Sequence, residues 1–120
     1  MANNPLKIEV QSEIGKLEAV LLHSPGAEVE NMTPRNAQRA LYSDILNLSI
    51  AQKEYEQVSG VLSKVAKIYQ IKDLLIKILD NHSEREALVG KICVTENVTD
   101  YFEYLMEMSS RNLANVLIEG

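Results

Sequence analysis

The spacing of apolar residues changes along this chain, and these changes constrain its fold. Apolar and polar residues alternate over 6–10, and the run 17–22 is almost continuously apolar. Alternation is typical of a half-buried strand, and a short continuous apolar run is typical of a buried one. The sequence therefore predicts strands near 6–10 and 17–23, with Gly15 in the turn between them.

Helical spacing follows, and then a return to strand spacing. Thr33 is a good N-cap for a helix over 34–42, because Pro34 next to it loses no hydrogen bond at the first helical position. A longer helix is predicted over 49–64, and a third strand over 66–71. The apolar stripe of the longer helix, which we expect to face the core, consists of Ala51, Tyr55, Val58, Leu62 and Val65. Strand, strand, helix and strand in this order make one ββαβ unit.

The second half of the chain has helical spacing throughout. Helices are predicted at 73–79, after Ser83, at 97–106, and after Ser109 or Ser110. Ser83 and Glu86 match a capping box, in which the two side chains satisfy each other's free backbone amides. The fold class is thus α+β, with a ββαβ unit in 1–71 and an all-helical subdomain in 72–120.

Composition narrows the possible partners and compartment. The 120 residues are 46% hydrophobic and carry a net charge of −5 without a basic cluster, which argues against nucleic acid as a partner. No apolar run approaches the roughly 18 residues of a membrane span, and the first residues do not resemble a signal peptide. The single Cys93 excludes an intramolecular disulfide. We therefore expect a cytoplasmic protein.

Several short motifs near the start of the chain occur in an informative order. They are Ser12-Glu13-Ile14-Gly15-Lys16-Leu17, His23-Ser24-Pro25-Gly26 and Glu30-Asn31-Met32-Thr33-Pro34. Together they resemble the start of an arginine deiminase, in the guanidino-group-modifying enzyme superfamily. Weaker similarity at 51–54 and 110–113 extends the resemblance over nearly the whole chain. It implies that 1–71 is the first blade of an α/β propeller and that 72–120 is a helical subdomain inserted after it.

The resemblance also implies a reaction, the hydrolysis of L-arginine to L-citrulline and ammonia without a metal or an organic cofactor. In the family a cysteine attacks the guanidinium carbon, a histidine shuttles protons, and carboxylates hold the cationic group. In the family those residues lie in later segments, beyond the part that this chain resembles, so no catalytic residue is assigned in it. Met32 stands where the family has a leucine that lines the arginine pocket. Asn31 precedes it, and both are expected to bind substrate in the complete enzyme.

Other residues that could carry chemistry have structural roles in this interpretation. Cys93 lies on the apolar face of a predicted helix, where a thiol behaves as a small hydrophobe. His23 is expected to fix its turn by a side-chain hydrogen bond, and His82 to lie on the surface in a polar loop. These residues have no spacing typical of a metal site.

A second hypothesis is a free-standing helical interaction module, related to the start of the deiminases, whose 72–120 half binds a partner. Under the first hypothesis, we expect the isolated chain to expose apolar surface that the complete fold covers. Self-association is then expected, most simply as a symmetric dimer. The expected contact residues are Leu17, Val20 and Leu22, or the helical stripe near Val58.

Overall fold

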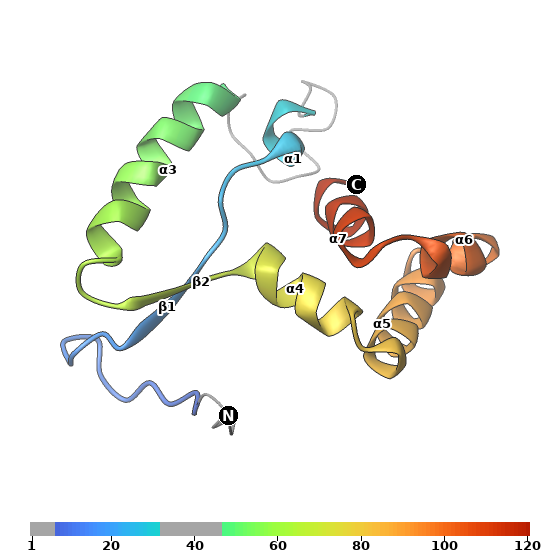
Figure 1. Cartoon of the computed structure of the whole chain (residues 1–120), viewed down its shortest axis with the longest axis horizontal. Coiled ribbons are helices and arrows are strands. Elements are labelled where there is room, and N and C mark those ends of the chain that lie inside the picture. Colours follow the sequence, from blue (N-terminus) through green and yellow to red (C-terminus); the bar gives the residue numbers. More distant parts are fainter. Residues whose placement is uncertain (1–6, 32–46) are drawn as a thin grey trace.

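The computed structural model describes residues 7–31 and 47–120, and most of these residues are helical. A small parallel sheet lies between α3 on one side and the helices α4 to α7 on the other (Figure 1). The elements in chain order are β1 (Ala19–Leu22), α1 (Ala27–Glu30), α3 (Leu48–Leu62), β2 (Lys67–Gln70), α4 (Ile71–Leu79), α5 (His82–Thr95), the short 3-10 helix η1 (Thr99–Tyr101), α6 (Phe102–Glu107) and α7 (Ser110–Glu119). The helix predicted over 34–42, with its cap at Thr33, lies outside the described residues.

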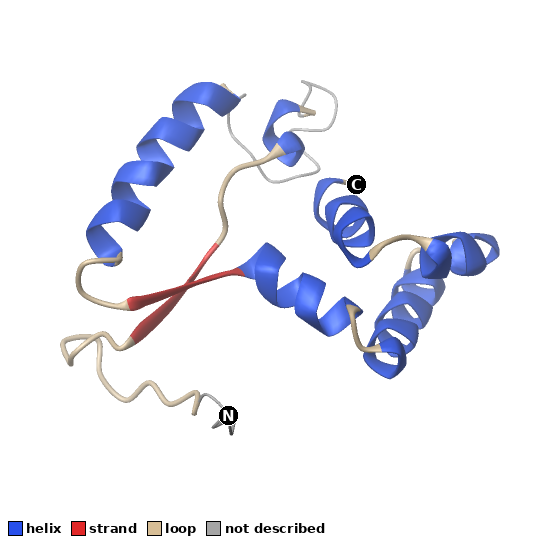
Figure 2. Ribbon diagram, in the orientation of Figure 1, coloured by secondary structure: helices blue, strands red, loops and turns tan. Residues whose placement is uncertain are grey.

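The sheet pairs β1 with β2 in parallel, from Ala19 opposite Lys67 to Leu22 opposite Gln70 (Figure 2). Both strands coincide with predicted ones, which are therefore confirmed with slightly shorter bounds. Parallel neighbours need a long crossover, since a tight turn reverses the chain direction. Here α3 lies within that crossover and contacts β2.

The first predicted strand is wrong over its described part, since residues 7–10 form no strand. Ile8 and Val10, whose alternation suggested a buried face, are 88% and 85% exposed. A strand needs a partner for its backbone groups and a surface for its apolar face. Among the described residues, this segment has neither, so the observed sheet contains β1 and β2 alone.

The long predicted helix is confirmed as α3, but its expected core stripe is not buried. Asn47 caps the helix, its side chain accepting a hydrogen bond from the Ile50 amide at 3.2 Å. No residue of α3 is fully buried, and Val58 and Val65 are 51% and 63% exposed. The strand β1, expected to be buried, is likewise only half-buried, with Leu21 exposed. A sheet of two short strands is too narrow to cover these apolar residues.

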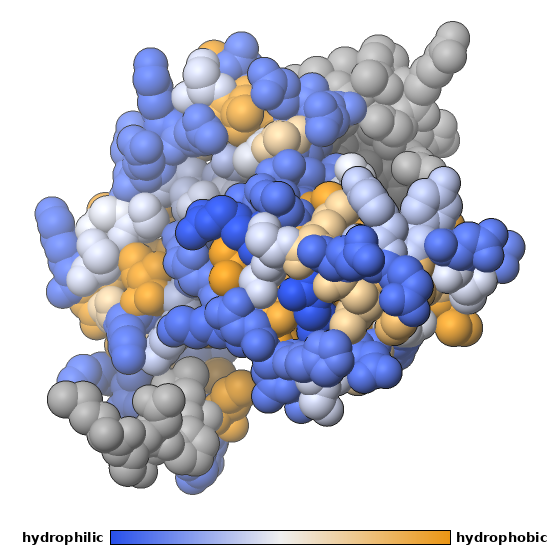
Figure 3. Space-filling model, turned by 45° about the vertical axis from the view of Figure 1, so that its right-hand side comes forward, coloured by the Kyte–Doolittle hydropathy of each residue, from blue (hydrophilic) through white to orange (hydrophobic). Residues whose placement is uncertain are grey.

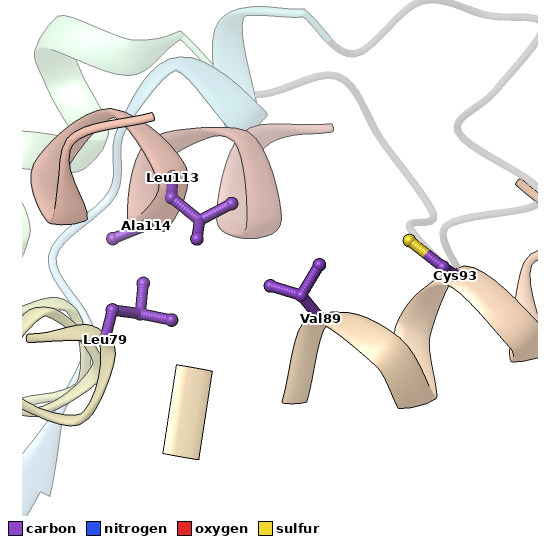
Figure 4. Close-up of a cluster of buried hydrophobic side chains, with 5 residues drawn as sticks. All are labelled: Leu79, Val89, Cys93, Leu113 and Ala114. Carbon is purple, nitrogen blue, oxygen red and sulfur yellow. The ribbon is translucent and has the colours of Figure 1, made fainter. Parts of the chain in front are cut away.

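The core lies instead among the helices of the second half. It comprises Leu79 from α4, Val89 and Cys93 from α5, and Leu113 and Ala114 from α7 (Figure 4). Half-buried neighbours from α4, α5, α6 and α7 pack around these side chains, among them Leu75, Leu88, Phe102, Leu105 and Leu117. The prediction of helices after residue 72 is confirmed, and they bury the apolar faces that their spacing indicated.

Helix caps agree with the sequence at one position and differ at another. Ser109 caps α7 as predicted, its hydroxyl accepting from the Asn112 amide at 3.2 Å. The predicted cap at Ser83 is wrong, because α5 begins at His82 and Asn81 is its cap. The Asn81 side chain accepts from the amides of Ser83 and Glu84, at 3.1 and 3.3 Å. An Asn three residues before Glu84 gives the same local signal as the Ser83 and Glu86 pair.

The helix predicted over 97–106 is broken at its start. Asn97 has a φ of 56°, a left-handed conformation that ends α5, and the Val98 amide donates to the Cys93 carbonyl at 2.9 Å. The chain then forms η1 and α6 rather than one helix. The guanidinium of Arg85 donates to the carbonyls of Leu105 and Met108, which fixes the carboxyl end of α6 to α5.

Candidate functional site

Side-chain hydrogen bonds connect the loop after β1 to β2 and to α3. The Ser24 hydroxyl donates to Gln70 Oε1 at 3.3 Å, which joins the loop to the carboxyl end of β2. The Gln52 side chain donates from Nε2 to the Pro25 carbonyl at 3.2 Å, which joins it to α3. Binding residues in α/β folds gather on loops beyond the carboxyl ends of strands. The loop from His23 to Asn31 is therefore the candidate site.

His23 and Glu28 close this loop onto the short helix α1. His23 Nε2 lies 2.7 Å from Glu28 Oε1, and both side chains are partly buried. The same carboxylate oxygen accepts from the Gly26 amide at 3.0 Å. The prediction that His23 fixes its turn by a side-chain hydrogen bond is confirmed.

Gly26 is required here by close approach. A Cβ built on Gly26 would lie 2.8 Å from Glu28 Oε2, closer than real Cβ contacts allow. The carboxylate cannot swing away freely, because its other oxygen holds both His23 and the Gly26 amide. The Pro-Gly sequence after β1 thus allows the carboxylate of Glu28 to fold back over the turn.

The environment of Glu28 favours its charged form. Burial alone raises the pKa of this carboxyl, but hydrogen bonds from its own backbone amide, from His23 and from the Gly26 amide lower it. The hydrogen bonds and the attraction to His23 outweigh burial, so the pKa of Glu28 lies below its ordinary value of 4.5. Glu28 is therefore an ionised acceptor at neutral pH.

A cavity of about 220 Å³ opens beside this loop, on the side that faces α3. Its lining consists of Ser24, Pro25, Gln52, Tyr55 and Glu56. Tyr55 Oη is shielded from solvent, and within the described residues it has no hydrogen-bond partner. A shielded hydroxyl without a partner is unusual, since leaving one unsatisfied costs about 1–3 kcal/mol.

The residues singled out in the sequence do not converge on one centre. Asn31 ends α1, its amide donating to the Ala27 carbonyl at 2.8 Å, and it lies at the surface. Met32 lies outside the described residues. Cys93 is 1% exposed in the helical core, and His82 is an exposed residue at the start of α5. Residues 7–31 and 47–120 contain no group of three His, Cys, Asp or Glu side chains that could hold a metal ion.

Sequence reasoning missed the partner of His23 and the lining of the cavity. Glu28 follows His23 by five residues across a Pro-Gly turn, a spacing that could have suggested the pair. Gln52 and Glu56 lie one helical turn apart on α3, which places them on one face. Tyr55 belongs to the stripe that was expected to face the core. No signal in the sequence indicated that α3 would lie against the loop after β1.

Comparison with known proteins identifies relatives over almost the whole chain. No family model matches. The arginine deiminase of Lactococcus lactis subsp. lactis is 36% identical over 121 residues, covering 94% of this chain. That of Borrelia recurrentis is also 36% identical over the same share, and that of Lactococcus lactis subsp. cremoris is 46% identical over 64% of the chain. The chain is a relative of the N-terminal portion of arginine deiminases.

The match to arginine deiminases covers a limited part of those proteins. The chain spans 30% of the length of the Lactococcus lactis subsp. lactis and Borrelia recurrentis enzymes. The resemblance to arginine deiminases, first seen in the motifs around Gly15, Pro25 and Asn31, is thus confirmed, and the similarity extends over nearly all of this sequence. Separately, no helix in the described part is long and apolar enough to cross a membrane.

Proposed function

We propose that this chain forms the N-terminal portion of an arginine deiminase, an enzyme that hydrolyses L-arginine to L-citrulline and ammonia. The observation that carries the proposal is the 36% identity over 94% of the chain to 30% of a deiminase's length. Within that enzyme the chain supplies scaffold and one wall of the arginine pocket. Asn31 and Met32 contact the substrate there, and the aliphatic part of arginine packs on Met32.

The proposed architecture is a propeller blade in 1–71 followed by a helical subdomain in 72–120. The parallel pairing of β1 with β2 and the run of helices after β2 support it. Exposed apolar side chains support it as well, since neighbouring blades would cover them. They include Leu17, Leu21, Val58, Val61 and Val65, and apolar patches are visible between polar ones on the molecular surface (Figure 3).

Catalysis in the proposed enzyme falls to residues that match no position in this chain. Attack on the guanidinium carbon requires a thiolate that substrate can reach. Cys93 is buried and packs in an apolar cluster with Val89 and Leu113, where substrate cannot reach its thiol. The isolated chain is therefore inactive.

The proposed setting is the cytoplasm, with L-arginine as the ligand of the complete enzyme and no nucleic acid partner. The isolated chain self-associates, because its exposed apolar side chains find one another when no blade covers them. Leu17, Val20, Leu22 and the surface near Val58 contribute to the contact.

A chimaera tests the proposal. Residues 7–120 of this chain replace the matching segment of the Lactococcus lactis subsp. lactis deiminase, and citrulline formation is measured for the chimaera and the isolated chain. We expect citrulline from the chimaera and none from the isolated chain. The matched control is the same deiminase without the segment, which should be inactive. In the chimaera, Cys93→Ala should leave the rate constant kcat unchanged.

Two outcomes would contradict the proposal. Citrulline formation by the isolated chain, abolished by Cys93→Ala, would make this chain an enzyme by itself. A chimaera that is soluble and has the circular dichroism of the parent, yet binds no arginine, would show that this segment does not serve a deiminase.

A second candidate function is a helical interaction module, favoured by one observation. The helices α4 to α7 enclose a core of their own, formed by Leu79, Val89, Cys93, Leu113 and Ala114. A half with a closed core can fold and bind a partner without the sheet. If residues 71–120 alone unfold cooperatively while the chimaera remains inactive, this second function is preferred.

A further inference from the structure

Charges of opposite sign are segregated in two stretches of this chain. Residues 57–72 carry three lysines and no Asp or Glu, whereas residues 92–110 carry four carboxylates and no Lys or Arg. The first stretch spans the end of α3, the strand β2 and the start of α4. The second spans the end of α5, the short helix η1 and α6. Each stretch thus gives its part of the surface a charge of one sign.

The carboxylates of the second stretch lie beside two exposed tyrosines on η1 and α6. At about 3.6 residues per helical turn, positions 100, 103, 104 and 107 share one side. Phe102, Leu105 and Met106 occupy the other side and pack against the helical core. The exposed side, which we call the tyrosine face, consists of Asp100, Tyr101, Glu103, Tyr104 and Glu107. Its tyrosines are 59% and 61% exposed, and tyrosines are frequent anchors of protein contacts.

Exposed valines and lysines lie together where α3 ends and β2 begins. This surface, which we call the valine face, consists of Val58, Val61, Lys64, Val65 and Lys67. The three valines are more than half exposed. The Lys64 amide donates to the Val61 carbonyl at 3.2 Å, so this lysine follows directly on the last turn of the helix. The valine face is therefore an apolar surface with cations beside it.

Each of the two faces complements the other rather than itself. Two tyrosine faces would bring carboxylates together and two valine faces would bring lysines together, and such like-charge contacts are unfavourable. A tyrosine face against a valine face pairs carboxylates with lysines and aromatic rings with valines. In the part of the chain that the structure describes, the ion pairs are Lys7 with Glu9 and His23 with Glu28. The charges of both faces therefore have no ionic partner there.

The two faces do not meet within one molecule, because α3 and α6 lie on opposite sides of it (Figure 1). We propose that the valine face of one chain docks on the tyrosine face of a second copy. A contact between two different surfaces runs head to tail, and it either closes into a ring or continues as an open chain. With five side chains from each copy it is far smaller than the 20–30 residues a side of a standard interface, about 800 Å² per partner, so the association is weak. The inference rests on the self-association proposed above and names its surfaces, and it does not require deiminase activity.

The test begins with sedimentation velocity of the 120-residue chain across micromolar concentrations, at about 0.1 M and about 1 M salt. We expect association at the lower salt that weakens at the higher salt. The reason is that the Debye length falls from about 10 Å to about 3 Å, which screens the pairs of lysine and carboxylate. A contact made by apolar surface alone would not weaken.

Charge reversal identifies the two surfaces. One variant combines Lys64→Glu with Lys67→Glu, and the other combines Glu103→Lys with Glu107→Lys. All four positions are exposed, so the fold should be kept, which circular dichroism checks. Each variant alone should raise the dissociation constant at least about tenfold, because like charges then oppose each other. An equimolar mixture should associate again, as a complex of one chain of each kind, because the reversed faces complement each other.

The matched control combines Lys77→Glu with Lys91→Glu. These two lysines are exposed and lie outside both faces. The change in net charge equals that of the variant with Lys64→Glu and Lys67→Glu. The control should therefore associate nearly as well as the unmodified chain.

Association that is lost in each reversed variant, kept in the control and restored in the mixture supports the docking. Association that survives both reversals would place the contact elsewhere, for example on Leu17 and Leu22, which overturns this docking but leaves self-association in place. An equal loss in the control would mean that net charge alone is responsible, which also overturns it. A chain that stays monomeric up to high micromolar concentration overturns both, while citrulline formation by the chimaera is a separate measurement.

Discussion

His23 Nε2 and Glu28 Oε1 lie 2.7 Å apart across the turn that ends β1, and the Gly26 amide donates to the same carboxylate oxygen. One acidic side chain therefore organises the loop that carries the candidate site. The pair also makes this loop sensitive to pH. Glu28 has a lowered pKa, so its contribution to stability is present above the ordinary carboxyl pKa and is lost as the pH falls through the folded value.

Glu28→Gln should therefore destabilise the chain at neutral pH, by about 1 kcal/mol, because a charged hydrogen-bond acceptor becomes neutral. The difference from the unmodified chain should shrink as the pH falls below 4.5, the ordinary value for this carboxyl. Urea unfolding at neutral pH and below pH 4.5 measures this difference in the free energy of unfolding. Glu30→Gln, at an exposed position of the same helix, is the control and should change little. An equal loss in both variants would mean that the pair with His23 contributes nothing specific.

The cap of α5 gives a second prediction. Asn81→Ala should lower the free energy of unfolding by about 1 kcal/mol, since two amides of the first turn lose their acceptor. Ser83→Ala should be close to neutral, because this exposed residue lies inside the first turn. Chemical unfolding of the two variants shows which substitution lowers the free energy of unfolding more. A larger effect at Ser83 would support Ser83 as the cap, as expected from the sequence.

Substitution by alanine should change the stability of the chain in opposite directions at two glycines. Gly60 lies inside α3 with nothing within 4 Å of an added Cβ, so Gly60→Ala should stabilise the chain by about 0.5–1 kcal/mol. Gly26→Ala should destabilise it, because the new methyl group would displace the Glu28 carboxylate from His23. Thermal unfolding monitored by circular dichroism measures both. Stabilisation by Gly26→Ala would show that Glu28 can move aside at no cost.

The thiol of Cys93 should be protected in the folded chain. At 1% exposure it is out of reach of a thiol reagent, so labelling should require opening of the helical core. We expect the labelling rate to rise steeply across the urea unfolding transition. Fast labelling in the absence of urea, with an unchanged circular dichroism spectrum, would contradict the burial of this residue.

Sequence periodicity predicted both strands of the sheet and the helices α3, α4, α5 and α7, because these depend on local spacing and turn residues. It did not predict α1, and it predicted one helix over 97–106 where the chain forms η1 and α6. Burial was predicted less well. The stripe with Val58 and Val65 has ideal spacing for a core face, yet whether such a face is covered depends on segments far away in the sequence. The same holds for Ile8 and Val10, whose alternation is consistent with a strand but cannot supply its partner.

In the candidate site, too, local contacts could be predicted and contacts between distant segments could not. The hydrogen bond of His23 could be expected because it forms within one turn. The cavity could not, because it requires α3 to lie against the loop after β1, with Gln52 reaching the Pro25 carbonyl across 27 positions. The sequence motifs directed attention to this loop, and long-range contacts determine what the loop faces.

The junction between β2 and α4 contains no linker, because Gln70 ends the strand and Ile71 begins the helix. The direction of the helical half relative to the sheet is therefore set by the backbone angles of one residue, with φ −98° and ψ 133° at Gln70. Inserting one residue here would turn the faces of α4 by about 100° about its axis. Leu79 would then point away from Leu113 and Ala114. The length of this junction therefore determines which face of α4 meets α7.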